Sequence, residues 1–332
     1  MKTKLIILAT LLSILSGCDG LAGKKEFLTV DFRQDQTLRY KFVSSRIVEV
    51  DWDPMKTTTK RGKETVRKFR ESMEMNIDYT PVEVDPYGLT TIKAKCGPVE
   101  VKRKSSSKKR LSNDDPVTLL HKKTYTFTVD PAGKIQDYSQ LDDLIKRIGA
   151  RAFKPKSRRG RIKEPDMIND FVAAQWFLWD SISSIEKPTK GVSVGQSWNS
   201  KLSVPTPMVS RIARQVTYTL DEIQQTEKDR IAVIKSSYAP AKSVPKDWPI
   251  PYSGQFRMSG TFGFMKNFVI LELEGQGEEL FNIDQGRIEK YNQNYKIVMD
   301  ASLLMPLGTS PRITIKQNLS MQLIKHWQNT KK

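Results

Sequence analysis

The sequence is poor in the side chains that carry most enzyme chemistry. Among its 332 residues it has two cysteines, Cys18 and Cys96, and two histidines, His121 and His326. Neither histidine stands at a spacing typical of a metal ligand, so there is little from which to build a zinc site or a histidine-based catalytic triad. We therefore expect no metal and no cofactor.

Paired carboxylates and catalytic motifs are lacking as well. The acidic residues that stand side by side are Asp114 and Asp115, Asp142 and Asp143, and Glu278 and Glu279. Neighbours on a helix or a strand point apart and cannot flank one bond. The chain has no Gly-x-Ser-x-Gly, His-Glu-x-x-His or phosphate-binding loop. The sequence thus predicts a protein that is not an enzyme and has no catalytic residues.

Long apolar runs are confined to the N-terminus. Lys2 and Lys4 precede an apolar run over residues 5–15, and small residues follow it. At 1.5 Å per helical residue this run is too short to cross a bilayer of about 30 Å. Its layout is typical of a secretory signal peptide, which we expect over residues 1–17.

The end of this run carries a specific motif, Leu15-Ser16-Gly17-Cys18. It resembles the lipobox of bacterial lipoproteins. The resemblance implies cleavage between Gly17 and Cys18 and a diacylglycerol on the Cys18 thiol. Residues 18–25 would then form a lipidated tether, and the body would lie outside the cytoplasm, tied to the inner or the outer membrane. The alternative is an ordinary signal peptide with an incidental cysteine.

Acidic residues are outnumbered by basic ones. The formal net charge is +18, and loss of Lys2 and Lys4 with the signal peptide would lower it to +16. In the envelope such a charge favours anionic lipid or an anionic polymer as partner, and export disfavours nucleic acid. A protein partner stays open. The residues that we expect to contact an anionic surface are Lys102, Arg103, Lys104, Lys108, Lys109 and Arg110. The alternative is that these charges belong to solvated loops.

Alternation of apolar and polar residues dominates the body of the chain. Residues 37–43 and 73–79 each place apolar side chains on one face of a strand and polar ones on the other. Ile92-Lys-Ala-Lys-Cys96 alternates too, so we expect Cys96 to be a buried, small side chain without a disulfide. Residues 312–324 form a late strand with a possible bulge at Gln317-Asn318.

Two turns share the pattern Asp-Pro-x-Gly, at residues 85–88 and 130–133, and residues 284–286 repeat part of the second. Asp, Pro and Gly in this order suit tight turns between antiparallel strands. This repeated pattern can arise by chance or from a duplication. We expect one β-rich domain over residues 26–330. An alternative left open by the sequence is that this domain consists of two similar halves, 26–138 and 190–326, joined by a helical segment 139–187.

Helical spacing is found only between these halves. Ser139 and Asp142 resemble a capping box ahead of a helix that ends near Gly149. A second helix is expected over residues 166–185, with apolar side chains on nearly all sides, so it must be buried. The fold class that follows is α+β: mainly an antiparallel curved sheet or partial β-barrel, with two centrally inserted helices.

This architecture resembles envelope lipoproteins whose curved sheet wraps a helix, such as the lipoprotein carrier and mycobacterial lipid-binding types. That likeness implies an apolar cavity, which Trp176, Phe177 and Trp179 would line. The alternative is that these rings simply fill the core. We expect a membrane-anchored, non-enzymatic binding or scaffold lipoprotein of the bacterial envelope, with a carrier of lipid or another apolar ligand as the alternative.

Overall fold

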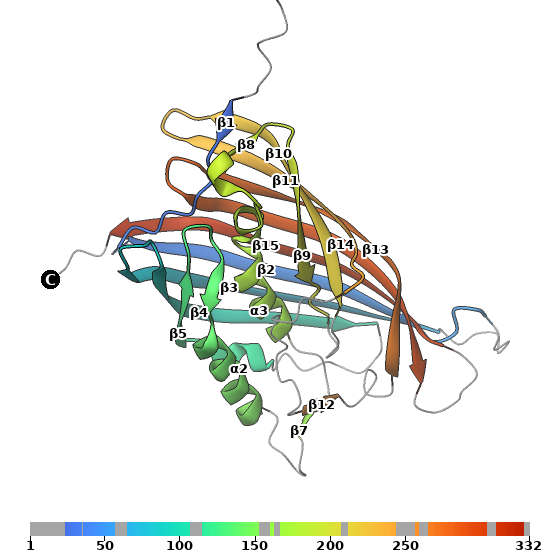
Figure 1. The fold of residues 1–332 in the computed structure, drawn as a ribbon. Coiled ribbons are helices and arrows are strands. Elements are labelled where there is room, and N and C mark those ends of the chain that lie inside the picture. The colour runs from blue at the N-terminus through green and yellow to red at the C-terminus, as the bar shows by residue number, and fades with distance from the viewer. Residues whose placement is uncertain are drawn as a thin grey trace, which may run out of the picture.

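The computed structural model describes residues 24–34, 36–56, 65–106, 115–152, 160–162, 167–206, 212–243, 256–258, 265–303 and 310–328. An antiparallel sheet of eleven strands dominates them (Figure 1). Its strands are β2 (Gln36–Asp51), β3 (Val66–Val84), β4 (Thr90–Ser105), β5 (Thr124–Val129), β6 (Ile135–Asp137), β9 (Ser197–Ser203), β10 (Ala213–Gln225), β11 (Arg230–Pro240), β13 (Met265–Asn282), β14 (Arg287–Leu303) and β15 (Arg312–Gln328). The prediction of a mainly antiparallel curved sheet is confirmed.

The strand order is β6-β5-β4-β3-β2-β15-β14-β13-β11-β10-β9. Strands from the two expected halves therefore lie in one sheet and meet where β2 pairs with β15. The edge strands, β6 and β9, are the ones that flank the helical segment in the sequence. A duplication of the halves stays a prediction.

Shorter elements lie around the large sheet. The helices are η1 (Pro116–Leu120), α2 (Ser139–Ala152), α3 (Ile168–Phe177), α4 (Asp180–Ser183) and η2 (Pro188–Lys190). Two small pairs of strands join β1 (Lys25–Glu26) to β8 (Val192–Ser193) and β7 (Gly160–Ile162) to β12 (Phe256–Met258).

The expectation of one continuous helix over residues 166–185 was wrong. The helix breaks between α3 and α4, at Leu178 and Trp179. The Trp179 ring packs against the rings of Phe32, Tyr79 and Phe127, with centroids 5.7 to 5.9 Å apart. Packing in the core thus overrides the local helical pattern at this point.

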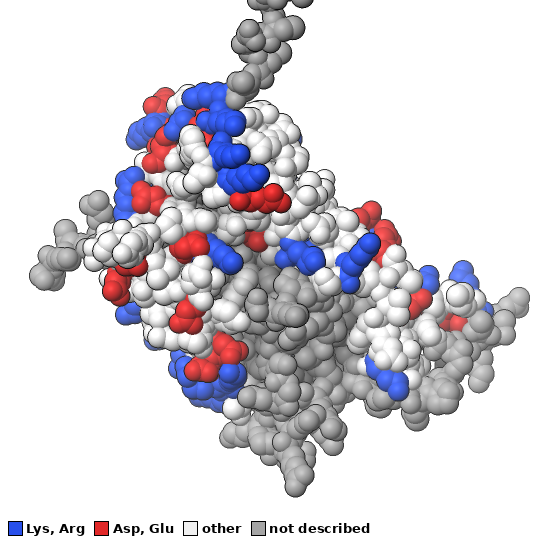
Figure 2. All heavy atoms as spheres, in the orientation of Figure 1, with Lys and Arg blue, Asp and Glu red and all other residues white. Residues whose placement is uncertain are grey.

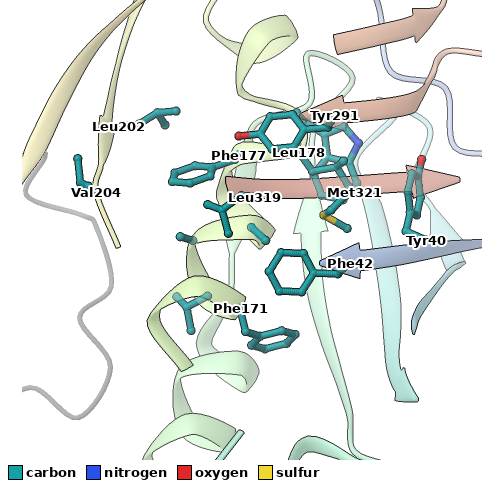
Figure 3. Packing of buried hydrophobic residues seen from close by; sticks show 14 of the residues in the cluster. Tyr40, Phe42, Phe171, Phe177, Leu178, Leu202, Val204, Tyr291, Leu319 and Met321 are labelled. Carbon is teal, nitrogen blue, oxygen red and sulfur yellow. The ribbon is translucent and has the colours of Figure 1, made fainter. Parts of the chain in front are cut away.

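Helix α3 packs against the inner face of the sheet, as its apolar circumference predicted. Figure 3 shows Phe171 and Phe177 of this helix in one cluster with Phe42, Leu319 and Met321 of the sheet. Two polar side chains of α3, Asp170 and Gln175, bond to side chains of the sheet. Gln175 Oε1 accepts hydrogen bonds from the hydroxyls of two sheet tyrosines, Tyr79 and Tyr125, at 2.6 and 2.7 Å.

Burial alternates along the long strands, so each strand has an inner face toward the helices and an outer face. Cys96 is buried with its strand neighbours Ile92 and Ala94, as expected. Burial raises the pKa of its thiol to about 12, which keeps it an unreactive apolar side chain. The bulge expected at Gln317-Asn318 was wrong, because the register of β15 against β2 shifts at Leu323/Lys325 instead.

The predicted Asp-Pro-x-Gly turns are confirmed. The Gly88 and Gly133 N–H groups bond to the carbonyls of Asp85 and Asp130, and both glycines have a φ of 84°, which a side chain would disfavour. The Gly133 turn and the Gly286 turn both pack on the N-terminal segment: Val30 N bonds to Pro131 O and Asp31 N bonds to Gly286 O. The first described residues thus bind together turns from opposite halves of the sheet.

Candidate functional site

An open groove with a volume of about 980 Å³ crosses the outer face of the sheet, on the side away from the helices. Most of its floor is formed by six neighbouring strands, β13, β14, β15, β2, β3 and β4, and Tyr238 of β11 also lines it. The outward side chains that line it stand in two rows, because residues that pair across antiparallel strands point to the same face.

One row is rich in positive charge. Pairing aligns its members in the order Glu274, Lys296, Lys316, Ile47, Arg70 and Lys104, and we call these six residues the cationic row. Two of its cross-strand pairs join like charges, Lys296 with Lys316 and Arg70 with Lys104. Like charges directly opposite each other destabilise a sheet. A bound anion would offset this cost.

The second row consists mostly of amides and hydroxyls. Its members are Gln276, Asn294, Asn318, Ser45, Ser72 and Lys102, in the order of pairing, and we call them the amide row. Asn318 Nδ2 donates to the Oδ1 atoms of Asn292 and Asn294 at 3.0 and 2.7 Å. These bonds fix the amides before any ligand arrives.

The cations differ in how they are compensated. Lys296 Nζ lies 2.8 Å from Glu272 Oε1 and 3.7 Å from Glu274 Oε1. Within the described ranges, no ion pair is formed by Arg70, Lys104 or Lys316. The groove therefore offers three uncompensated cations along one line, which is the electrostatic requirement for binding an anion.

A second groove of about 500 Å³ continues from the first. It shares Gly275, Gln276 and Asn294 with the first groove, and it reaches β11 and β10. Pairing extends the amide row across this region through Ser237, Thr217 and Asn199. Hydroxyl and amide side chains thus run in register from β3 to β9.

Beneath the floor of the groove, on the inner face, lies a buried ionic cluster. Its members are Arg46, Glu71, Arg103, Asp115 and Asp170. Arg46 Nε lies 2.5 Å from Glu71 Oε2, and Arg103 Nε lies 3.1 Å from Glu71 Oε1. Burial raises the pKa of Asp170, although Arg46 and a hydrogen bond from Ser44 oppose that shift. The cluster connects β2, β3 and β4 to α3 and to the residue before η1, so it holds the groove floor in place.

Another buried arginine, Arg214, has no carboxylate ion pair among the described residues and is surrounded by rings instead. Its guanidinium lies 4.2 to 5.1 Å from the ring centroids of Phe177, Tyr238 and Tyr295, and Nη2 donates to Gln293 Oε1 at 2.5 Å. Aromatic faces attract such a cation. This cage supports the other part of the floor, because the Tyr238 and Tyr295 positions line the groove.

Two carboxyl groups near this cage have shifted pKa values. Burial raises the pKa of Asp180 to about 6 and that of Glu279 to about 8. Hydrogen bonds from Tyr218 and Ser200 to Asp180, and from Ser181 to Glu279, oppose the shifts. Glu279 is buried and Asp180 is half-buried, and neither lines a groove, so both bear on stability.

The part of the chain that the structure describes holds no group of three or more His, Cys, Asp or Glu residues placed to bind a metal ion. Its helices are all too short or too polar to cross a bilayer. On the side seen in Figure 2, acidic and basic side chains are interspersed.

The basic segment expected to contact an anionic surface is divided by the strand. Lys102 and Lys104 are exposed and line the groove. Arg103 is buried and does not line the groove, because strand alternation turns its side chain inward to Glu71 and Asp115. The expectation that Arg103 contacts an anionic surface was therefore wrong. Lys108, Lys109 and Arg110 lie outside the described residues.

The three aromatic residues expected to line an apolar cavity have protein neighbours. The Trp176 ring meets Tyr138 edge to face at 4.4 Å, Phe177 packs on Arg214, and Trp179 lies among three other rings. An acyl chain would have to displace these contacts. Gly17 and Cys18, the expected cleavage and lipidation positions, lie outside the described residues.

Sequence reasoning missed most of the groove. Arg70 and Lys316 are single positions in alternating strands, and the Asn and Gln residues of the amide row look like ordinary solvent-facing positions. Alternation could have placed each of them on the outer face. The register that aligns them is the signal that a single sequence does not contain.

Comparison with known proteins gives little about function. A model described as a family of unknown function (DUF6263) matches residues 89–237, which is less than half of the chain. No curated protein matches the sequence.

Two solved structures show a distant likeness. One is described by its title as lipid–protein interactions in lipovitellin; the identity is 11% and the TM-score 0.48, and the match covers 91% of this chain but 26% of that one. The other is an acetoacetate decarboxylase-like enzyme from Sphingomonas wittichii RW1, with 8% identity and a TM-score of 0.13, covering 92% of this chain and 100% of that one. Neither likeness is close enough to support a function.

Proposed function

We propose that this protein is a lipid-anchored, non-enzymatic binding protein of the bacterial cell envelope, and that the groove on its outer face binds an anionic ligand. The observation that carries the proposal is the line of uncompensated cations formed by Arg70, Lys104 and Lys316. Their charge is concentrated in one hollow, whereas elsewhere many basic side chains are matched by acids.

The composition of the groove favours binding over catalysis. Of its outward lining residues one is acidic, Glu274, and it lies beside Lys296. General acid–base chemistry needs groups that titrate near the working pH and face the ligand. The lining supplies fixed positive charges and neutral hydrogen-bonding groups, which attract and orient a ligand.

The lipid anchor is supported by the N-terminal sequence, Leu15-Ser16-Gly17-Cys18. Acyl chains contribute about 0.8 kcal/mol for each buried methylene, so two or more chains hold a protein durably on a membrane. In that compartment the anionic partners at hand are lipid headgroups and envelope polymers. The same groove in the cytosol would meet nucleic acid.

The anchor is tested by expressing the full chain in a bacterial host and analysing its N-terminal peptide by mass spectrometry. The expected product begins at Cys18, carries a diacylglycerol and fractionates with membranes. A Cys18→Ala variant should remain unprocessed. A wild-type product that is unacylated at Cys18 and stays in the cytosol would refute the anchor.

The groove is tested with the full chain in detergent, using a polyanion as probe. Replacing Arg70, Lys104 and Lys316 by Gln should weaken binding roughly 10-fold or more, because each exposed charge contributes a fraction of a kcal/mol to about 1 kcal/mol. The matched control replaces Lys93, Lys95 and Lys123, which are exposed and lie outside the groove lining. Equal losses in both triple variants would show that net charge, not the groove, drives binding.

A further inference from the structure

The groove has a shape as well as a charge. The cationic row and the amide row both run perpendicular to the strands, each with one residue for every strand from β13 to β4. Strands lie about 4.8 Å apart, so six strands make a site about 24 Å long. The second groove lengthens the amide row toward β9. This is an elongated site.

We infer that the ligand of this groove is a linear acidic polysaccharide that lies across the strands, with its acid groups toward the cationic row and its hydroxyls toward the amide row. This inference rests on the proposed function, because it names the ligand of the same groove.

The amide row discriminates between kinds of anion. Amide and hydroxyl side chains both donate and accept hydrogen bonds, and a sugar hydroxyl does the same. Phosphate oxygens of a polyphosphate accept only. A row that continues through Ser237, Thr217 and Asn199, beyond the reach of the unpaired cations, adds contacts for a neutral, hydroxyl-bearing stretch of polymer.

The lining also disfavours a lipid molecule as the ligand. Ile47 is the one apolar residue in the two rows, and all other members of these rows are polar or charged. Burying an acyl chain requires a continuous apolar wall, since each methylene gains about 0.8 kcal/mol only when it leaves water. A headgroup alone would occupy a small part of the length of the site.

The amides are arranged in advance of binding. Asn318 donates to Asn292 and Asn294, so the Nδ2 groups of these two partners remain available as donors on the outer face. Beneath them, the ionic cluster around Arg46 and the aromatic cage around Arg214 hold the backbone of the floor. A site fixed in this way loses little conformational entropy when it binds.

The test uses the full acylated chain in detergent with four probes: polygalacturonate as acidic polysaccharide, dextran as neutral polysaccharide, polyphosphate as an anion without hydroxyls, and glycerol phosphate as a soluble lipid headgroup. We expect polygalacturonate to bind most tightly. Oligogalacturonates of increasing length should bind with affinity that rises until the groove is spanned. A monomer that binds as tightly as the polymer would overturn the inference.

Variants separate the two rows. Replacing Gln276, Asn294 and Asn318 by Ala should weaken polygalacturonate binding about 10-fold and leave polyphosphate binding within 2-fold, since each lost hydrogen bond contributes about 1 kcal/mol or less. The control replaces Lys93 and Lys95, outside the groove, by Gln. Unchanged circular dichroism and unfolding midpoint would establish that the Ala variant is folded.

The outcomes distinguish this inference from the proposed function. If no polyanion binds, the proposed function of the groove fails. If polyphosphate or the soluble headgroup binds as well as polygalacturonate, and the Ala variant binds every probe like the wild type, the groove binds anions but the polysaccharide inference is wrong.

Discussion

The two faces of the sheet differ in whether their cationic side chains have carboxylate partners. On the inner face, Arg46 and Arg103 are buried and share the carboxylates of Glu71, Asp115 and Asp170. On the outer face, Arg70, Lys104 and Lys316 stand in a groove without such partners among the described residues. Alternate residues of the same strands supply both sets, as Arg103 and Lys104 show.

The contrast separates charges that hold the fold from charges that are free to bind. A buried cation cannot be left alone, because its desolvation costs several kcal/mol. A surface cation remains hydrated and has little effect on stability. The inner arginines should therefore matter for folding and the outer cations for ligand binding, and each prediction below tests one side of that division.

The largest effect is expected from Glu71→Gln. This change removes a carboxylate that serves both Arg46 and Arg103, so the free energy of unfolding should fall by about 3 kcal/mol or more. The control is Glu74→Gln on the outward face of the same strand, which should change it by less than about 0.5 kcal/mol. Urea unfolding measures both. Equal losses of stability in the two variants would refute the different roles assigned to the two faces.

The next largest effect is the pH dependence of the free energy of unfolding, which a buried carboxyl group on the inner face should cause. Burial raises the pKa of Glu279 from 4.5 to about 8, so between these values the unfolded chain releases a proton that the folded protein keeps. Stability should therefore fall as pH rises, by up to about 1.4 kcal/mol per pH unit, and the loss should level off above pH 8. Asp180 adds a similar loss between its ordinary pKa and about 6.

Glu279→Gln isolates this contribution. The amide keeps the shape of the side chain and cannot ionise, so the slope of stability against pH should flatten between pH 6 and 8. The variant should also be more stable than the wild type at pH 8. Urea midpoints measured at several pH values decide the matter, and an unchanged slope would refute the assignment to Glu279.

A smaller effect is expected from Gly277→Ala. An added Cβ would clash with the Tyr238 hydroxyl and come within 2.8 Å of Asn292 O, which crowds the cage around Arg214. Overpacking of this kind costs about 1–3 kcal/mol. The adjacent outward substitution, Gln276→Ala, should be nearly neutral for stability. Thermal unfolding compares the two, and a neutral Gly277→Ala would show that the cage has room to adjust.

The smallest effect, with the opposite sign, is expected from Lys104→Gln. This change relieves the like-charge pair with Arg70, so stability should stay constant or rise by a few tenths of a kcal/mol. Binding of the polyanion should weaken at the same time. A clear loss of stability would mean that Lys104 has a structural role, and the contrast between the faces would no longer hold for it.

Much of the fold follows from local patterns. Alternation in residues 37–43 and 73–79 placed these strands, and the apolar circumference of residues 166–185 indicated a buried helical region. The break at Leu178 and Trp179 could not be foreseen, because it depends on aromatic rings from distant parts of the chain. Arg103 was misassigned because the run of basic residues was treated as one surface, although alternation turns its members to opposite faces.

The sequence by itself determined which side chains point inward or outward, because the period of a strand is a local property. It also supplied the expectation of an anchor at Cys18, through a motif of four adjacent residues. Only the tertiary structure decided which outward residues stand together. Lys316 lies beside Ile47, and Ile47 beside Arg70, because β15 pairs with β2 and β2 with β3 in one particular register. That register is set by the packing of the whole inner face, so no local stretch of the chain contains it.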